Sequence, residues 1–145
     1  MAEQRVVESR HLADEAATLA FAGELLPHLE GAPLVFLEGQ LGAGKTTLVR
    51  GILRALGHEG SVKSPTYTLL EPYEVAGRTI YHFDLYRIGD SEELDFIGFD
   101  ELLDTDAIKL IEWPEQGAGR LPAPDVRIRL SLEGEGRRVE VSVYS

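Results

Sequence analysis

The stretch LVFLEGQLGAGKTTLVRGIL, from Leu34 to Leu53, decides the fold of this chain. Within it lies the spacing G-x-x-x-x-G-K-[ST], which is typical of a loop that binds nucleotide phosphates. An apolar run before the loop, Leu34 to Leu37, predicts a buried strand, and helical spacing after it continues to Leu56. Gly57 then offers a helix end. Strand, glycine turn and helix thus follow in the order that phosphate binding requires.

The residue types in this loop match the chemistry of a triphosphate site. The glycines allow backbone angles and close approach that a β-carbon would prevent, so that amide groups point at phosphate oxygens. A lysine here reaches the β- and γ-phosphates, and a hydroxyl enters the Mg²⁺ shell. The residues concerned are Gly39, Gly42, Ala43, Gly44, Lys45, Thr46 and Thr47.

The overall composition limits the class of protein. A length of 145 residues fits one domain, residues 1–145, with an ordinary hydrophobic content of 43%. No cysteine is present, which excludes disulfides and cysteine-based zinc sites. No apolar run approaches the roughly 20 residues of a membrane span, and no signal-peptide core is visible, so we expect a cytoplasmic protein. The net charge of −11 disfavours direct binding to nucleic acid and suits a basic protein partner.

Flanking segments predict an α/β fold. We expect a short edge strand at residues 4–8 and an amphipathic helix from Asp14, its N-cap, to Leu29, with a stop or kink of the regular helix near Pro27. Two hairpins follow the phosphate loop. The first joins residues 67–75 to 78–86 and is inserted where a doubly wound fold places a helix; the second joins 126–133 to 137–144 and closes the sheet. The prediction is a single P-loop NTPase domain whose central mixed sheet carries an inserted antiparallel hairpin and is flanked by helices.

The segment from Asp90 to Asp106 is acidic, lacks lysine and arginine, and has interspersed apolar residues. We expect one or two short helices here, with Ser91 as the first N-cap. A solvated acidic face over an apolar stripe explains this pattern, and so does a docking surface for a basic partner.

A P-loop site also needs an acid at the end of a neighbouring strand to hold Mg²⁺. Asp84 ends the run TIYHFD, and Glu112 ends IKLIE. Spacing alone leaves both open for the metal or for the attacking water, and a structural salt bridge is the alternative for each. His82 falls on the same face of its strand as Asp84, where it either contacts the site or packs in the core.

Several further residues stay unranked by the sequence. Trp113 either lies near the nucleotide or covers the core, and the turn Ser64 to Tyr67 is either a γ-phosphate sensor or a plain proline turn. The NKxD pattern of guanine recognition is absent, and the D-x-x-G match at 95–98 lies in the acidic segment rather than at a strand end, which favours ATP over GTP. The arginines available to face the phosphates are Arg50, Arg54, Arg87, Arg137 and Arg138.

Four blocks together, GQLGAGKTT, VKSPTYTL, YHFDLYRI and LIEWPEQG, resemble the TsaE (YjeE) family of small bacterial P-loop ATPases. They run from Gly39 to Gly117, and the flanks are compatible, so the resemblance covers nearly the whole chain. It implies a cytoplasmic ATPase that is required for the tRNA modification threonylcarbamoyladenosine (t6A). It also implies action with a TsaB–TsaD pair, in which TsaD performs the transfer and tRNA is met only through the partners.

The resemblance also implies roles for individual residues. Thr46 and Glu112 would hold Mg²⁺, so Glu112 rather than Asp84 is assigned to the metal, and the residues implied in catalysis are Lys45, Asp84 and Glu112. The turn from Ser64 to Tyr67 would act as a switch. The implied contacts to ATP or ADP are Ala13, Gly39, Gly42, Ala43, Gly44, Lys45, Thr46, Thr47, Thr66, Glu112, Trp113 and Arg137.

Two other classes of protein remain open at this stage. A small-molecule P-loop kinase would need an acceptor pocket and usually an arginine-bearing lid, and nothing after Trp113 resembles such a lid. A GTPase-like switch would prefer GTP and bind its partner in a nucleotide-dependent way.

Overall fold

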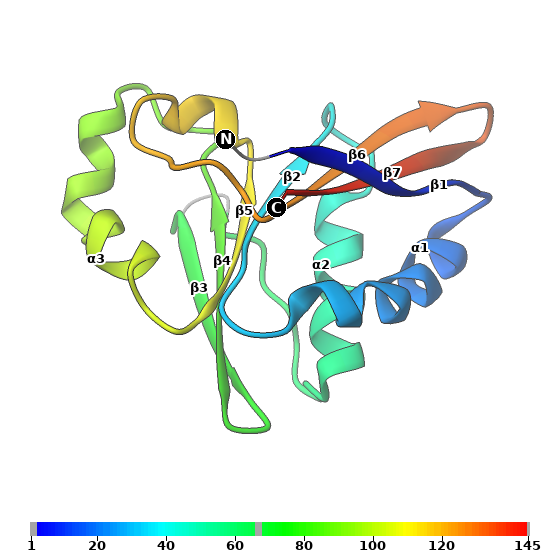
Figure 1. Ribbon diagram of the computed structural model, residues 1–145, viewed down its shortest axis with the longest axis horizontal. Coiled ribbons are helices and arrows are strands. Elements are labelled where there is room, and N and C mark those ends of the chain that lie inside the picture. The colour runs from blue at the N-terminus through cyan, green and yellow to red at the C-terminus, as the bar shows by residue number, and fades with distance from the viewer. Residues whose placement is uncertain (1–2, 66–67, 145) are drawn as a thin grey trace.

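The computed structural model describes residues 3–65 and 68–144, which fold around one mixed sheet with helices on both faces (Figure 1). Its strand order is β1-β7-β6-β2-β5-β4-β3. The strands are β1 (Gln4–Leu12), β2 (Leu34–Glu38), β3 (Leu70–Val75), β4 (Arg78–Asp84), β5 (Ile108–Glu112), β6 (Val126–Glu133) and β7 (Gly136–Tyr144). The helices are α1 (Glu15–Ala22), α2 (Lys45–Leu56) and α3 (Phe99–Leu103), and the 3₁₀ helices are η1 (Gly23–Leu29), η2 (Ser91–Ile97) and η3 (Pro114–Gly117).

The centre of the sheet is parallel and its margins are antiparallel. Strand β2 pairs in parallel with both β5 and β6, and β5 pairs in parallel with β4. The pairs β3–β4, β6–β7 and β1–β7 are antiparallel. The expected α/β class with an inserted hairpin is therefore confirmed. The carboxyl ends of β2, β4 and β5 meet at one edge, the upper one in Figure 1.

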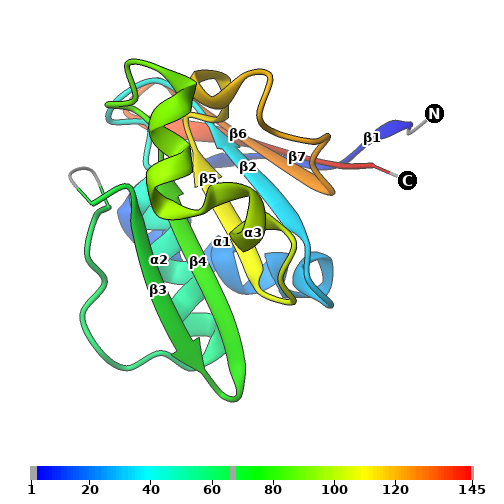
Figure 2. The same cartoon turned by 90° about the vertical axis from the view of Figure 1, so that its left-hand side faces the viewer.

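Helices cover the two faces of the sheet unequally. One face packs against α1, η1 and α2 in a large apolar cluster that includes Val35, Leu37 and Ile128. The other face packs against η2 and α3 in a smaller cluster that includes Phe36 and Phe83. Figure 2 shows α3 in front of the sheet and α1 and α2 behind it. Since both faces are covered, the central strands β2 and β5 consist almost entirely of buried residues.

Helix α2 follows the expected pattern. Its apolar side, including Leu48, Ile52 and Leu53, is fully buried against the sheet and α1. It ends at Gly57, which adopts φ 118° and whose amide donates to the Arg54 carbonyl at 3.0 Å. A left-handed residue at this position satisfies the last carbonyls of the helix, so the predicted end is confirmed.

Two N-terminal predictions were wrong in their bounds. Strand β1 extends to Leu12, beyond the expected residues 4–8, because its backbone pairs with β7 along its length despite its polar side chains. The α-helix from Asp14 stops at Ala22 and continues as 3₁₀ helix to Leu29. Pro27 lacks the amide that an α-helix needs at that position. The Asp14 N-cap is confirmed, since its carboxylate accepts from the Ala17 amide at 2.9 Å.

Three central boundaries also differ. Asp90, not Ser91, caps η2, because the Asp90 carboxylate accepts from the Glu92 amide while the Glu93 carboxylate accepts from the Asp90 amide. Strand β4 ends at Asp84 rather than residue 86, since the Asp84 carboxylate accepts from the Tyr86 amide at 3.0 Å and turns the chain. Strand β3 begins at Leu70 rather than at Tyr67, because Thr68 and Leu69 form a turn in which Leu69 adopts φ 67°; Tyr67 itself lies outside the described residues.

The acidic segment is amphipathic as expected. Leu94 and Phe99 are fully buried, while the carboxylates face solvent. Arg120, from the loop after η3, forms ion pairs with Asp95 and Asp100 and so ties this segment to the sheet. Phe96 is 89% exposed among these carboxylates.

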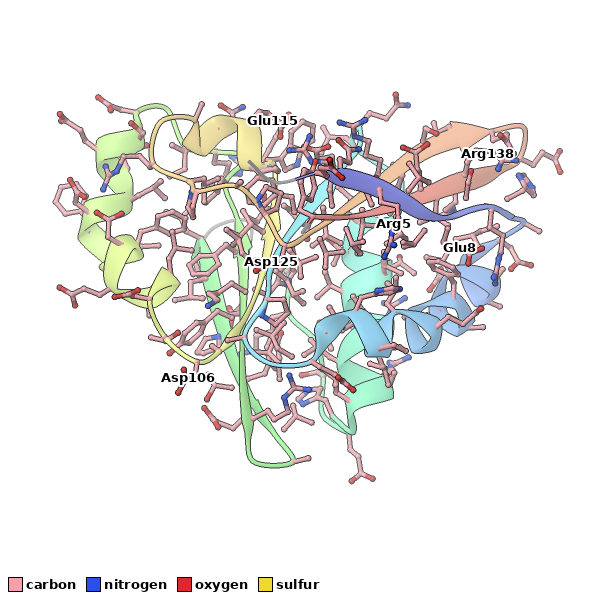
Figure 3. The ribbon with its side chains drawn as sticks, viewed as in Figure 1. Arg5, Glu8, Asp106, Glu115, Asp125 and Arg138 are labelled. Atoms are coloured by element: carbon pink, nitrogen blue, oxygen red, sulfur yellow. The ribbon has the colours of Figure 1, made fainter. Side chains whose placement is uncertain are left out.

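The two edges of the open sheet are β1 and β3. Strand β1 presents charged side chains along its length, and Figure 3 shows Arg5 and Glu8 on it. Strand β3 contains Pro72, opposite Tyr81 of β4. In the part of the chain that is described, no helix combines the length and the apolarity needed to cross a membrane.

Helices α1 and α2 touch at Gly51, which makes a test of packing possible. A β-carbon there would lie 2.7 Å from the Ala22 β-carbon and 3.1 Å from the Leu19 carbonyl oxygen. Alanine favours a helix by about 1 kcal/mol over glycine, but overpacking costs about 1–3 kcal/mol. We predict that Gly51→Ala lowers the free energy of unfolding, measured by urea denaturation.

Gly23 supplies the matched control, because it is helical and a β-carbon there meets nothing within 4 Å. Gly23→Ala should leave stability unchanged or raise it. Equal stability of Gly51→Ala and the wild-type protein would contradict the close α1–α2 contact.

Candidate nucleotide-binding site

The phosphate loop joins the end of β2 to the start of α2. Gly39 and Gly44 adopt φ values of 153° and 102°. A β-carbon on Gly39 would collide with the Leu130 carbonyl oxygen, and one on Gly44 would collide with the Arg137 guanidinium. The backbone angles demand glycine at both positions, and the Leu130 backbone carbonyl also demands it at Gly39. The loop is a cradle of backbone amides at a helix N-terminus, the arrangement that binds anions.

Lys45 lies inside this loop with only 5% of its surface exposed. Its ammonium donates to the Gly39 carbonyl and lies 3.6 Å from the centroid of the Trp113 ring. Burial lowers the pKa of Lys45, while the negative charges of Glu112, Glu115 and Asp84 act in the opposite direction. Figure 3 places Glu115 on η3, at the upper edge where these strands end.

The two candidate acids end neighbouring parallel strands and are in register with each other. Asp84 is 6% exposed and Glu112 is 3% exposed. A Glu112 carboxylate oxygen accepts from the Thr46 hydroxyl at 3.2 Å and lies 2.6 Å from His82 Nε2. A hydroxyl and a carboxylate this close are the hard oxygen ligands that Mg²⁺ prefers, so these residues fit the ion. Among residues 3–65 and 68–144, no group of three or more His, Asp or Glu side chains is arranged to hold a metal ion.

Trp113 follows Glu112 directly and turns its ring over the loop. Its φ of 57° is uncommon for a large side chain and is fixed by the η3 turn that begins at Pro114. The ring also contacts Tyr86, with centroids 4.9 Å apart. Two aromatic rings and the lysine thus form one wall of the site.

These groups surround a pocket of about 600 Å³ beside the phosphate loop. It is open enough to admit a nucleotide. Its lining residues are Glu15, Leu41, Gly42, Gly44, Lys45, Thr46, Thr47, Ser64, Asp84, Tyr86, Arg87, Glu112, Trp113 and Arg137.

Most of the sequence-predicted residues gather at this pocket, and three of those that the structure describes, Ala13, Gly39 and Ala43, do not line it. The Gly39 carbonyl accepts a hydrogen bond from the Lys45 ammonium, and Ala43 is fully buried within the loop. Ala13 lies beside Gly136, and Glu15, two residues further along the chain, lines the pocket. Thr66 lies outside the described residues, as does Tyr67 of the proposed switch.

The structure separates the five arginines. Arg87 and Arg137 line the pocket, and Arg137 packs on Gly44. Its Nε atom is buried and has no hydrogen-bond partner in the described part of the chain. Arg50 pairs with Glu15 at 2.5 Å and Arg138 with Glu133 at 2.6 Å. Figure 3 shows Arg138 toward the outer end of the β6–β7 hairpin. Arg54 is exposed and does not line the pocket.

Sequence reasoning did not find the contact between His82 and Glu112, or the place of Glu15 and Leu41 in the pocket. Alternation along a strand predicted that His82 and Asp84 lie on the same face of β4, but it says nothing about contacts with the neighbouring strand. Only the register between β4 and β5 shows that the imidazole reaches the acid of the neighbouring strand. No local pattern marks Glu15 or Leu41.

A strand, a glycine loop and a helix N-terminus, with a buried lysine and a strand-end acid beside the loop threonine, define a P-loop nucleotide-binding protein. The family model described as "Threonylcarbamoyl adenosine biosynthesis protein TsaE" matches residues 12–139 of the chain. The chain therefore belongs to the TsaE family.

Relatives of known name agree with this assignment. A protein of Haemophilus influenzae named "tRNA threonylcarbamoyladenosine biosynthesis protein TsaE" is 48% identical over 138 residues, which is 92% of this chain and 87% of the relative. A protein of the same name from Treponema pallidum is 39% identical over 136 residues, 93% of this chain and 96% of the relative. The crystal structure of YdiB from Bacillus subtilis is similar with a TM-score of 0.78 and 26% identity, covering 99% of this chain and 87% of that one.

The stacked Lys45 and Trp113 give a pH-dependent prediction, since Trp113 is the single tryptophan. Burial lowers the pKa of Lys45 below 10.5 in the folded protein, so the folded state releases this proton before the unfolded chain does. The contribution of Lys45 to the free energy of unfolding therefore rises with pH between its folded pKa and 10.5. We predict that tryptophan emission changes with a midpoint below 10.5, as the cation over the ring loses its charge.

Lys45→Met is the control, with circular dichroism recorded at each pH to confirm that both proteins stay folded. The transition should be absent from this variant. The same titration in both proteins would show that the emission reports other groups.

Proposed function

We propose that this protein is a Mg²⁺-dependent ATPase that serves the biosynthesis of threonylcarbamoyladenosine in tRNA. One observation supports this above all: within a TsaE-family chain, Lys45, Thr46, Asp84 and Glu112 converge on one pocket at the carboxyl edge of the parallel strands. Residues 1–145 would act as one domain in the cytoplasm, with ATP or ADP and Mg²⁺ as ligands.

The residues divide the work of binding and hydrolysis as follows. The loop amides from Gly42 to Thr47 bind the phosphates, and Lys45 stabilises charge on the β- and γ-phosphates. Thr46 and Glu112 hold Mg²⁺, which neutralises charge that develops on the phosphate oxygens. Asp84 faces the same pocket and orients the attacking water or accepts its proton.

Other residues position the nucleotide around this centre. Trp113 borders the phosphate loop and Arg137 supports it from the β7 side. The backbone near Ala13 and the loop residues Gly39 and Ala43 complete the proposed contacts. Ser64 to Tyr67, with Thr66 touching the nucleotide, act as the switch.

The proposed partners are TsaB and TsaD, with TsaD transferring the threonylcarbamoyl group and tRNA met only through the complex. The net charge of −11 supports this division, because such a protein repels a phosphate backbone unless other subunits supply basic surface. Hydrolysis would reset the conformation of TsaD, which requires that the partners bind the ATP and ADP states with different affinities.

Steady-state ATP hydrolysis tests the catalytic roles. Lys45→Ala and Glu112→Ala should each lower the rate by about 10²-fold or more, because each removes a group that stabilises charge on the transferred phosphoryl group. Glu101→Ala, an exposed glutamate of α3 away from the pocket, is the matched control and should keep the wild-type rate. Wild-type rates in Lys45→Ala would remove the phosphate loop from the mechanism.

A second measurement tests the partnership. The hydrolysis rate should rise only when TsaB and TsaD are added together, and the rise should vanish in Lys45→Ala and Glu112→Ala. A rate indifferent to both partners would favour an enzyme that acts alone. Phosphate release without any acceptor argues against a small-molecule kinase, and preference for GTP in a competition assay would favour a GTPase-like switch.

A further inference from the structure

His82 lies on β4 with its side chain completely buried. Its Nε2 atom is 2.6 Å from a carboxylate oxygen of Glu112, the last residue of the adjacent strand. The hydrogen bond runs diagonally across the parallel pair, since His82 is in register with Leu110 and Asp84 is in register with Glu112. The imidazole therefore contacts the acid from the neighbouring strand of the sheet.

Glu112 depends on such support because its carboxylate is nearly fully buried. A buried carboxylate needs hydrogen-bond donors to replace water. The Thr46 hydroxyl and His82 both contact the same oxygen, Oε2, at 3.2 and 2.6 Å, whereas Oε1 lies 3.5 Å from the hydroxyl. Thr46 belongs to the loop that binds the nucleotide, so His82 is the contact that comes from the rigid sheet.

The second ring nitrogen indicates how the imidazole is used. His82 Nδ1 is buried and has no hydrogen-bond partner among residues 3–65 and 68–144. A proton on that atom would be a buried donor without an acceptor, which is costly. The neutral tautomer with hydrogen on Nε2 avoids this cost and donates to the carboxylate.

We infer that His82 is a positioning residue for Glu112: its Nε2–H fixes the carboxylate in the rotamer that faces Thr46 and the phosphate loop. Partners of this kind hold metal-binding carboxylates in one orientation, and their loss typically lowers metal affinity or activity by about 10–100-fold. The inference rests on the proposed function, in which Glu112 and Thr46 hold Mg²⁺ with the nucleotide.

Binding of a fluorescent ADP analogue, MANT-ADP, with Mg²⁺ and with a chelator in its place, tests this without relying on hydrolysis. His82→Leu should raise the Mg²⁺ concentration needed for half-maximal enhancement of binding by about 10–100-fold. Affinity in the presence of the chelator should stay within about 3-fold of the wild-type value, because the phosphate loop is untouched.

Two polar substitutions separate positioning from packing. A glutamine amide nitrogen falls near the place of His Nε2, whereas asparagine is too short to reach it. His82→Gln should therefore keep most of the Mg²⁺ dependence and His82→Asn should lose it. If His82→Leu does not fold, this pair still decides the question. Equal Mg²⁺ dependence in the glutamine and asparagine variants overturns the inference.

A double variant shows whether His82 acts through Glu112. Adding His82→Leu to Glu112→Gln should produce no further change in Mg²⁺ dependence, whereas an additive change overturns the inference. Ser142→Ala, which removes a buried hydroxyl of β7 that is bonded to Gln4, is the matched control and should change nothing.

The same measurements distinguish a failure of the proposed metal role of Glu112 from a failure of the positioning role of His82. If wild-type binding does not depend on Mg²⁺, or if Glu112→Gln leaves that dependence intact, the proposed metal role of Glu112 fails. If Glu112→Gln loses the dependence and His82→Leu keeps it, only the role of His82 fails.

Discussion

The buried positive charge of Lys45 is the constraint on which the rest of the site depends. An ammonium group deprived of water is costly unless negative charge lies close to it. Asp84 and Glu112 supply that charge, and both are themselves almost fully buried. Each of these buried charges is stabilised by the opposite charge beside it. The phosphate loop, β4 and β5 must therefore be held in fixed positions relative to one another. The parallel register of β4 and β5 provides it by placing both acids at the same level.

The architecture around this centre follows from the same requirement. Parallel strands end at one edge, so β2 delivers the phosphate loop where β4 and β5 deliver their acids. The β6–β7 hairpin brings Arg137 against Gly44, and its β6 strand places the Leu130 carbonyl against Gly39. The β6–β7 hairpin therefore widens the sheet and also packs against the two glycines. Trp113 adopts a left-handed backbone, with φ 57°, directly after Glu112.

Sequence patterns predicted those features whose determinants are local. The glycine spacing, the helix end at Gly57, both hairpins and the gathering of Lys45, Thr46, Asp84 and Glu112 all depend on residues close together in the chain or on strand-end geometry. Features set by tertiary pairing were missed. The length of β1 depends on β7, and the His82–Glu112 contact depends on strand register. The choice of Asp90 over Ser91 is local, because it depends on a reciprocal bond with Glu93, and it was missed because both residue types cap helices. The spacing of Asp84 and Glu112 did not rank them, and contact with Thr46 distinguishes Glu112.

The open sheet has a consequence for behaviour at high concentration. Its two outermost strands expose backbone amides and carbonyls that another chain could pair with, as happens when proteins associate into fibrils. Alternating charges on β1, such as Arg5 and Glu8, raise the free energy of such pairing. Pro72 on β3 removes one of the amides that an added strand would need. Both edge strands thus resist pairing with another chain. The sheet can therefore remain open at its edges while its central strands form the nucleotide site.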